Sequence, residues 1–176
     1  MAITTLDPKT ALIVVDLQKG IAGRQAAHPV ADIVKQSVAL LDAFRKHKLP
    51  VVLVNVDGVA PGRNEQPRMP ATFPAEFFEL LPELKQQPSD HVVTKRTWGA
   101  FTNTDLDVWL KKNDVTQVVC CGIATSAGVE STARFAQELG YNVTLATDAM
   151  TDMSADAHEN SVRGIFQRMG ETGMRS

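Results

Sequence analysis

Runs of apolar residues alternate along the chain with segments in which apolar residues recur at helical spacing. Five apolar runs predict β-strands, at residues 11–16, 51–56, 91–95, 115–121 and 142–146. The intervening segments predict helices over residues 30–48, 75–81 (a short one), 103 or 104 to 112, 128–139 and 154–169. Because strands and helices alternate, we expect a doubly wound α/β sandwich with a mostly parallel sheet and helices on both faces. The pattern leaves the order of the strands open.

Residues suited to helix ends support these boundaries. Asn103 or Thr104 can cap one helix, Ser154 can cap another, and Gly140 follows the end of a third. The exception to the alternation is a Pro-rich connection over residues 57–90, which is longer than most connections between elements. We interpret it as a wall of a ligand pocket or as a surface that packs on another subunit.

Composition narrows the class of protein. The 176 residues suffice for one domain with a substantial core, so we expect a single domain over residues 1–176. With 44% hydrophobic residues, 22% charged residues and a formal net charge of −2, nothing favours binding to nucleic acid or to anionic membranes. The sequence has neither a signal-peptide pattern nor an apolar run long enough to span a membrane, so we expect a cytoplasmic protein.

The cysteines and histidines do not form a recognisable site. Cys120 and Cys121 are adjacent on a predicted strand, so their side chains should point to opposite faces of the sheet as buried small hydrophobic residues. Neither a disulfide framework nor a Cys-x-x-Cys metal site is expected. The histidines are scattered over predicted loops, helices and a strand, and we expect structural or exposed roles for all of them: His28, His47, His91 and His158.

Three groups of residues suited to chemistry stand where predicted strands end. Asp16 ends the first strand, Lys95 ends the third, and a turn from Ile123 to Gly128 follows the fourth. In doubly wound sheets the carboxyl ends of the strands form the ligand-binding edge. We therefore expect these groups to converge on one site. The structural alternative is that Asp16 only caps a turn and that Lys95 is solvated at its strand end.

Three motifs follow one another along the chain: Val-Asp-Leu-Gln at residues 15–18, Thr-Lys-Arg-Thr-Trp-Gly-Ala-Phe at 94–101 and Gly-Ile-Ala-Thr-Ser-Ala-Gly-Val-Glu-Ser-Thr-Ala at 122–133. Together they resemble the motifs of the isochorismatase-like superfamily of cysteine hydrolases, and Asp-Ala at 148–149, after the fifth predicted strand, fits as well. The resemblance implies a Rossmann-like fold and a triad in which Asp16 accepts a thiol proton, Lys95 holds the carboxylate and a cysteine attacks a carboxamide carbon. This chain has Gly128 where the family usually has that cysteine, so no acyl-enzyme can form there.

A minority branch of the family, the isochorismatases of siderophore and phenazine pathways, also has glycine at that position. Resemblance to that branch implies hydrolysis of a vinyl ether, with Asp16 as general acid and water as the attacking group. This chain has Ala124 where that branch has tyrosine, and the rest of the motif resembles the thiol branch and uncharacterised single-domain bacterial members. Vinyl ether hydrolysis and another water-mediated hydrolysis both stay open. The balance between burial of Asp16 and its pairing with Lys95 decides the protonation of the carboxyl group.

The resemblance also implies the remaining parts of the site. We expect a cis peptide bond between Ile123 and Ala124, and we expect the amides of Ala124 and Gly128 to form an oxyanion hole. Trp98 and Phe101 either line an aromatic pocket or belong to the core. The candidate substrate-binding residues are Gln18, Trp98, Phe101 and Ile123.

Metal-binding relatives of the nicotinamidase type use an Asp-x-His near the second strand. Here Asp57-Gly58-Val59 lacks the histidine, so we expect no metal, and no cofactor. The resemblance implies a small-molecule substrate and a homo-oligomer, either a dimer or a tetramer. A hypothesis from another class is a catalytically silent family member that binds a small molecule or serves in assembly.

Overall fold

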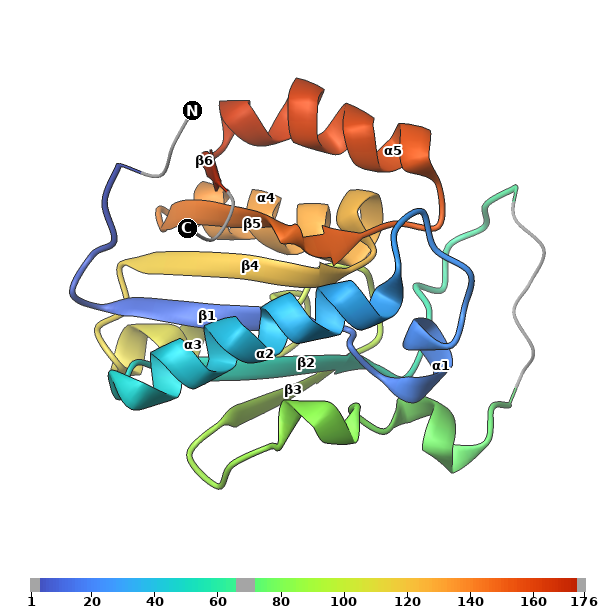
Figure 1. Cartoon of the computed structure of the whole chain (residues 1–176), viewed down its shortest axis with the longest axis horizontal. Coiled ribbons are helices and arrows are strands. Elements are labelled where there is room, and N and C mark those ends of the chain that lie inside the picture. Colours follow the sequence, from blue (N-terminus) through green and yellow to red (C-terminus); the bar gives the residue numbers. More distant parts are fainter. Residues whose placement is uncertain (1–3, 66–71, 174–176) are drawn as a thin grey trace.

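A computed structural model describes residues 4–65 and 72–173 of the chain (Figure 1). Its sheet has six strands in the order β3-β2-β1-β4-β5-β6, and all of them run parallel. The doubly wound α/β fold predicted from the sequence is confirmed. The strand order reverses between β1 and β4, so the carboxyl ends of these two strands form the switch point at which such folds bind ligands. The strands are β1 (Thr10–Val15), β2 (Val51–Val56), β3 (His91–Lys95), β4 (Gln117–Ile123), β5 (Asn142–Thr151) and β6 (Glu171–Gly173).

Two apolar cores lie on the two faces of the sheet, because successive side chains of a strand point to opposite sides. Ile13 and Val15 of β1 pack on the face of α3 (Leu106–Lys112) and α4 (Glu130–Glu138). Leu12 and Val14 pack on the opposite face, under α2 (Val30–Lys46). In Figure 1, α2 lies in front of the sheet and α3 and α4 lie behind it. Cys120 and Cys121 fall in different cores, as their adjacency predicts.

Several predicted helices are interrupted. The helix predicted from residue 128 starts as a π-helical turn, η3 (Thr125–Val129), and continues as α4. The helix predicted over 154–169 is α5 (Ala155–Asn160), followed by a π-helical turn, η4 (Ser161–Ile165), and a 3₁₀ turn, η5 (Phe166–Arg168). Periodicity of apolar residues cannot distinguish these coils from an α-helix, because all of them bury one face.

The helix ends and the last strands refine the sequence prediction. The Ser154 hydroxyl accepts a hydrogen bond from the Ala157 amide, the Thr104 hydroxyl accepts one from the Leu106 amide, and Gly140 follows α4 with a φ of 91°. The prediction that strand five ends at residue 146 is wrong, because β5 continues to Thr151 after its register against β4 shifts. Residues 148–149 therefore lie within β5 and not after it.

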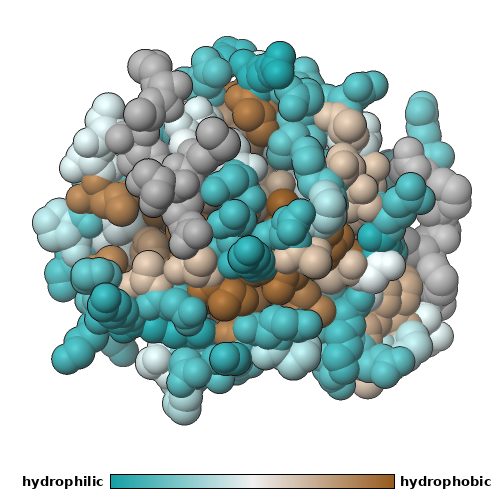
Figure 2. Space-filling model, viewed as in Figure 1, coloured by the Kyte–Doolittle hydropathy of each residue, from teal (hydrophilic) through white to brown (hydrophobic). Residues whose placement is uncertain are grey.

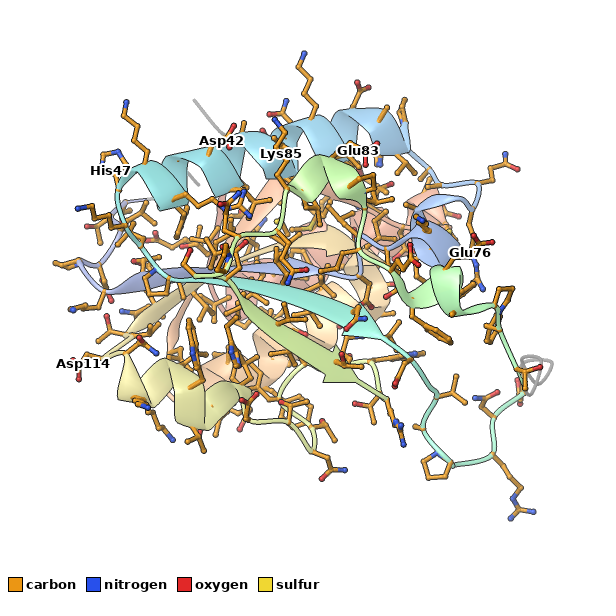
Figure 3. The ribbon with its side chains drawn as sticks, turned by 90° about the horizontal axis from the view of Figure 1, so that it is seen from below. Asp42, His47, Glu76, Glu83, Lys85 and Asp114 are labelled. Carbon is orange, nitrogen blue, oxygen red and sulfur yellow. The ribbon has the colours of Figure 1, made fainter. Side chains whose placement is uncertain are left out.

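The long connection between β2 and β3 returns to the carboxyl end of β1. Its predicted helix over residues 75–81 is replaced by two 3₁₀ turns, η1 (Ala75–Phe78) and η2 (Pro82–Leu84), and residues 66–71 lie outside the described part of the chain. Gln18 and Leu80 form an antiparallel bridge beside the short helix α1 (Lys19–Ala22). In Figure 3, η2, which contains Glu83 and directly precedes Lys85, lies against α2, and the label Glu76 marks η1. The connection thus borders the edge of the sheet on which Asp16 stands.

Polar and charged side chains cover most of the face that carries α2, with apolar patches among them (Figure 2). None of the helices in the described part of the chain has the length and apolar character needed to cross a membrane.

Candidate active site

Asp16 and Lys95 meet at the carboxyl edge of the sheet. Lys95 is the last residue of β3 and Asp16 directly follows β1, and the Lys95 ammonium donates to Asp16 Oδ2 at 2.7 Å and to the Thr97 carbonyl oxygen at 3.1 Å. Their side chains are only 1% and 8% exposed, respectively. The alternative in which Lys95 is solvated at its strand end is therefore wrong. The two predicted residues form a buried ion pair that spans β2.

The second carboxylate oxygen of Asp16 is the unusual feature of this pair. Oδ1 is buried and has no hydrogen-bond partner among the described residues. Burial of the carboxyl group raises its pKa from 3.8 to about 6, although the charge of Lys95 and its hydrogen bond pull the pKa down. A buried acceptor without a partner costs stability, so its persistence points to a role in binding or proton transfer.

Gly128 lies against this carboxylate. A Cβ atom built on Gly128 would stand 3.1 Å from Asp16 Oδ2, 3.0 Å from Val15 Cγ1 and 3.5 Å from the Trp98 carbonyl oxygen. The position at which the resemblance places a thiol therefore faces the ion pair. The structure brings Asp16, Lys95 and Gly128 together at one point.

Gly122, the second-last residue of β4, allows the backbones of β1 and β4 to approach closely here. It has a φ of 116°, and a Cβ atom on it would lie 2.0 Å from the Val15 carbonyl oxygen. Only glycine adopts this conformation readily and leaves room for the neighbouring backbone. Asp16 also has a positive φ, of 52°, which aspartate tolerates better than most residues.

The turn after β4 contains the expected cis peptide bond between Ile123 and Ala124, so that prediction is confirmed. The carbonyl oxygen of Ala124 accepts from the amides of Ala127 and Val129, both at 3.1 Å, which closes the turn into η3. That the amides of Ala124 and Gly128 serve as oxyanion donors stays a prediction.

Two side chains from beyond β5 hold this turn. Asp152 Oδ2 accepts from the amide and the hydroxyl of Ser126, both at 2.7 Å, and Asp152 Oδ1 accepts from the Ser154 amide at 3.2 Å. The Thr125 hydroxyl and His158 Nδ1 are 2.8 Å apart, and both side chains are buried. The sequence analysis missed both anchors. The pattern Asp152 followed by Ser154 at a helix start was a signal for the first anchor, but nothing in the sequence links residue 158 to residue 125.

His158 is also in contact with a second histidine. Its ring centroid is 4.7 Å from that of His28, whose own Nδ1 lies 3.0 Å from the Thr151 hydroxyl oxygen. Burial, followed by the proximity of His28, lowers the pKa of His158. The structural roles expected for these two histidines agree with their placement. The loop that precedes α2 is held to the end of β5 by His28 and by the Ala27 amide, which donates to the Asp152 carbonyl oxygen at 2.8 Å.

The four candidate substrate-binding residues have different surroundings. The Gln18 amide group is fully buried and hydrogen-bonded to the backbone of Val56 and to the Phe77 carbonyl oxygen, so it braces the edge of the sheet. Trp98 is 68% exposed, and its carbonyl oxygen, not its ring, approaches position 128. Phe101 packs against the core under α3 and α4, and Ile123 is buried in the core under α2.

The two cysteines offer no replacement for the absent nucleophile. Both are free and fully buried, and burial raises the pKa of each thiol well above its usual value. A neutral buried thiol is a poor nucleophile, so the interpretation of Cys120 and Cys121 as core residues agrees with the structure.

Groups of three or more His, Cys, Asp or Glu side chains that could hold a metal ion are absent from residues 4–65 and 72–173. The expectation that the protein needs no metal stays a prediction. What the described site offers is one carboxyl group able to exchange a proton near neutral pH, one fixed ammonium group beside it and one turn of backbone anchored by Asp152 and His158.

Comparisons with known proteins find relatives that match nearly the whole chain. The model of the isochorismatase domain matches residues 10–174. YwoC, an uncharacterized isochorismatase family protein of Bacillus subtilis (strain 168), is 42% identical over 172 residues, which cover 93% of this chain and 89% of that protein. Streptothricin hydrolase of Streptomyces noursei is 34% identical over 140 residues, which cover 79% of this chain and 48% of that enzyme. The solved structure of an isochorismatase family protein from Burkholderia thailandensis is 39% identical, with a TM-score of 0.94 and coverage of 98% of this chain and 95% of that chain.

Proposed function

The chain belongs to the isochorismatase family of hydrolases, and from this premise we propose that it hydrolyses a small metabolite without a cysteine nucleophile. In this proposal Asp16 is the general acid, Lys95 is its electrostatic partner, and water takes the place of the thiol. If the substrate is hydrolysed by water through a tetrahedral intermediate, the amides of Ala124 and Gly128 would bind the oxygen on which negative charge develops.

The observation that supports this proposal most strongly is the free Oδ1 of Asp16. Oδ2 is occupied by the Lys95 ammonium, whereas Oδ1 has no partner among the described residues and lies at the edge of the sheet where ligands bind. Burial has raised the pKa of this carboxyl group to about 6, so a substantial fraction is protonated in weakly acidic solution. A protonated Oδ1 can donate to a substrate without giving up the contact with Lys95.

Hydrolysis of a vinyl ether fits these groups because it needs no nucleophilic side chain. Asp16 would transfer its proton to the enol carbon, which leaves positive charge shared between the neighbouring carbon and the ether oxygen. Water would then add to that carbon and lose a proton, and the resulting hemiketal would collapse to a carbonyl product and an alcohol. Asp16 as a general acid contributes on the order of 10²- to 10⁴-fold to such a step.

A screen of small vinyl ethers, carboxamides and esters with the wild type and with Asp16→Asn tests the proposal. We expect turnover of at least one vinyl ether by the wild type and its loss in the variant. Turnover by both proteins at the same rate would exclude a role for Asp16 in proton transfer. No turnover of any compound would leave the silent family member as the better description.

The Gly128→Cys variant tests whether the site can still support a cysteine nucleophile. The new Cβ would stand 3.0 Å from Val15 Cγ1 and 3.1 Å from Asp16 Oδ2, so both neighbours must move by a few tenths of an ångström. We expect no gain of amidase activity, because this closeness pushes the carboxylate and the sulfur out of alignment. A variant that hydrolyses carboxamides and is inactivated by iodoacetamide would instead support a site that recently lost its cysteine.

The homo-oligomer implied by the family resemblance also stays a prediction. Light scattering of the purified protein checks it, and a monomer at all concentrations would remove the expectation.

A further inference from the structure

Three segments that follow three different strands are tied together beside the candidate active site. The segment after β1 contributes His28, the segment after β4 contributes Thr125, and the segment after β5 contributes His158. Figure 1 shows the connection from α1 to α2 rising beside the start of α5. We call four side chains the histidine clasp: His28, Thr125, Thr151 and His158. Because the first segment starts at Asp16 and the second carries the turn, the clasp joins the two parts of the proposed site.

The contact between His158 and Thr125 forms the inner half of the clasp. Thr125 is fully buried, His158 is 6% exposed, and Nδ1 lies 2.8 Å from the hydroxyl oxygen. The hydroxyl has no other partner among the described residues, and a buried hydroxyl without a partner is costly. Thr125 is the first residue of η3 and directly follows Ala124. A shift of its side chain therefore moves the main chain of the turn.

The contact between His28 and His158 forms the outer half. The two ring centroids are 4.7 Å apart, and the rings meet edge to face at 62°. His28 is itself held by Thr151, because its amide donates to the Thr151 hydroxyl oxygen at 3.1 Å and its Nδ1 lies 3.0 Å from the same oxygen. Contacts on two sides leave the His158 ring little freedom to turn away from Thr125.

The surroundings of His158 keep its ring neutral. Burial, followed by the proximity of His28, lowers the pKa of His158, and the carboxylates of Glu159 and Asp152 oppose this shift only in part. Glu159 pairs with Arg163, and Asp152 already accepts hydrogen bonds from the turn and from the start of α5. A neutral imidazole offers one donor and one acceptor nitrogen. His158 therefore acts on the turn through a directional hydrogen bond and not through a charge.

We infer that His158 is a positioning residue for the proposed hydrolysis. Its hydrogen bond to Thr125 holds the turn that carries the proposed oxyanion donors, and His28 holds the ring in place. The same turn lies against the acid, since a Cβ atom on Gly128 would stand 3.1 Å from Asp16 Oδ2. The catalytic part of this inference rests on the proposed function, whereas the order of the turn is measured without any substrate.

His158→Leu and His158→Asn test the hydrogen bond, because the two side chains are similar in size and only Asn offers a polar atom near the position of Nδ1. Hydrogen exchange followed by NMR reports on two amides of the turn, those of Ser126 and Val129, which donate to Asp152 Oδ2 and to the Ala124 carbonyl oxygen. In the Leu variant both should exchange roughly tenfold faster or more, relative to amides in the middle of β4. The Asn variant should recover most of the protection.

Thr125→Val and Thr125→Ser make the same comparison from the other side of the bond, and they replace the first pair if His158→Leu does not fold. Circular dichroism checks the folding of every variant. His91→Leu is the matched control, because this histidine also contacts an aromatic ring and a polar partner, Trp109 at 4.5 Å and Asp105 at 3.1 Å, but lies at the start of β3. It should leave exchange in the turn unchanged.

His28→Ala tests the outer half of the clasp. It removes the neighbouring ring and admits water, so the pKa of His158 should rise toward its ordinary value in an NMR titration. Exchange in the turn should accelerate less than in His158→Leu. An unchanged pKa and unchanged exchange would remove His28 from the inference.

Kinetics shows whether the position of the turn matters in the reaction. On a substrate found in the screen, His158→Leu should lower kcat about tenfold and change KM by about twofold or less, because the turn is needed most in the transition state. His158→Asn should recover most of kcat.

Four outcomes decide between the possibilities. Acceleration of exchange by one factor throughout the sheet, or equal effects of the Leu and Asn variants, would overturn the inference, since His158 would then contribute only packing. Local acceleration with an unchanged kcat would also overturn it. Local acceleration in a protein that hydrolyses nothing would support His158 as the residue that orders the turn and would reject the proposed function.

Discussion

Two ion pairs with largely buried carboxylates differ in how completely their hydrogen bonds are satisfied. In the pair of Arg45 and Asp90, the guanidinium contacts both carboxylate oxygens, at 2.5 and 3.4 Å, and also donates to the Leu84 carbonyl oxygen at 3.0 Å, while the Gln87 amide donates to Asp90 at 2.8 Å. In the pair of Lys95 and Asp16, a single ammonium contacts one carboxylate oxygen, and the other oxygen has no partner among the described residues.

Under the proposed function, this difference separates a structural ion pair from a catalytic one. The Arg45 and Asp90 side chains, 17% and 2% exposed, tie η2 and the start of β3 to α2, and every polar atom of the carboxylate is used. The Asp16 side chain is 8% exposed, and its Oδ1, which has no partner among the described residues, is the oxygen that the proposed function assigns to the substrate. An ion pair in which every oxygen of the carboxylate accepts a hydrogen bond is costly to disrupt. A carboxylate with one unpaired oxygen can instead gain or lose a proton there without breaking a hydrogen bond.

The largest expected difference is in catalysis. Asp16→Asn should lower kcat/KM by about 10³-fold, because the amide cannot donate a proton as an acid does. Asp90→Asn should change kcat/KM only a few-fold. Steady-state kinetics on a substrate found in the screen measures both values. Equal losses of kcat/KM in the two variants would show that the Asp16 pair has no special role in catalysis.

Stability should show the opposite order. Arg45→Met leaves the buried Asp90 carboxylate without its cation and should lower the free energy of unfolding by about 3 kcal/mol. Lys95→Met should cost less at pH 5, because burial lets Asp16 take up a proton and become neutral. Urea denaturation at pH 5 compares the two variants. A greater loss in Lys95→Met would show that the Asp16 pair is the more important structural element.

The pH dependence of kcat/KM tests whether Asp16 acts as a general acid. With a pKa of about 6, the carboxyl group is protonated below pH 6, so kcat/KM should be constant there and should fall about tenfold per pH unit above it. Lys95→Met removes the charge that lowers this pKa and should move the falling limb to higher pH. A limb that rises with pH in the wild type would assign Asp16 the role of a general base.

The smallest expected effect concerns a third buried carboxylate, that of Asp152. Its contacts with Ser126 and Ser154 satisfy both oxygens, as in the Arg45 pair. Ser126→Ala removes one hydrogen bond and leaves the amide contact, so the free energy of unfolding should fall by about 1 kcal/mol and kcat/KM by less than tenfold. A loss of activity above 10²-fold without a matching loss of stability would place the Ser126 hydroxyl in the reaction.

The sequence was sufficient to predict the convergence of Asp16, Lys95 and Gly128. In a parallel sheet the position of a strand end is fixed by the hydrophobic run before it, and all carboxyl ends share one edge. The strand order, the short strand β6 and the extension of β5 were not predictable in this way, because they depend on pairing between distant segments. The sequence also does not show which polar side chains already have hydrogen-bond partners. Gln18, for example, was a candidate for binding substrate, but its amide group bonds to the backbone of Val56 and to the Phe77 carbonyl oxygen.

The close approach of β1 and β4 at Gly122 has a consequence for redesign. A Cβ atom on Gly122 would lie 2.0 Å from the Val15 carbonyl oxygen. The spacing between Asp16 and the turn after β4 is therefore set by the main chain and not by interchangeable side chains. Libraries that seek new substrates should therefore keep residue 122 as glycine, because randomisation there will return mostly unfolded or misaligned clones.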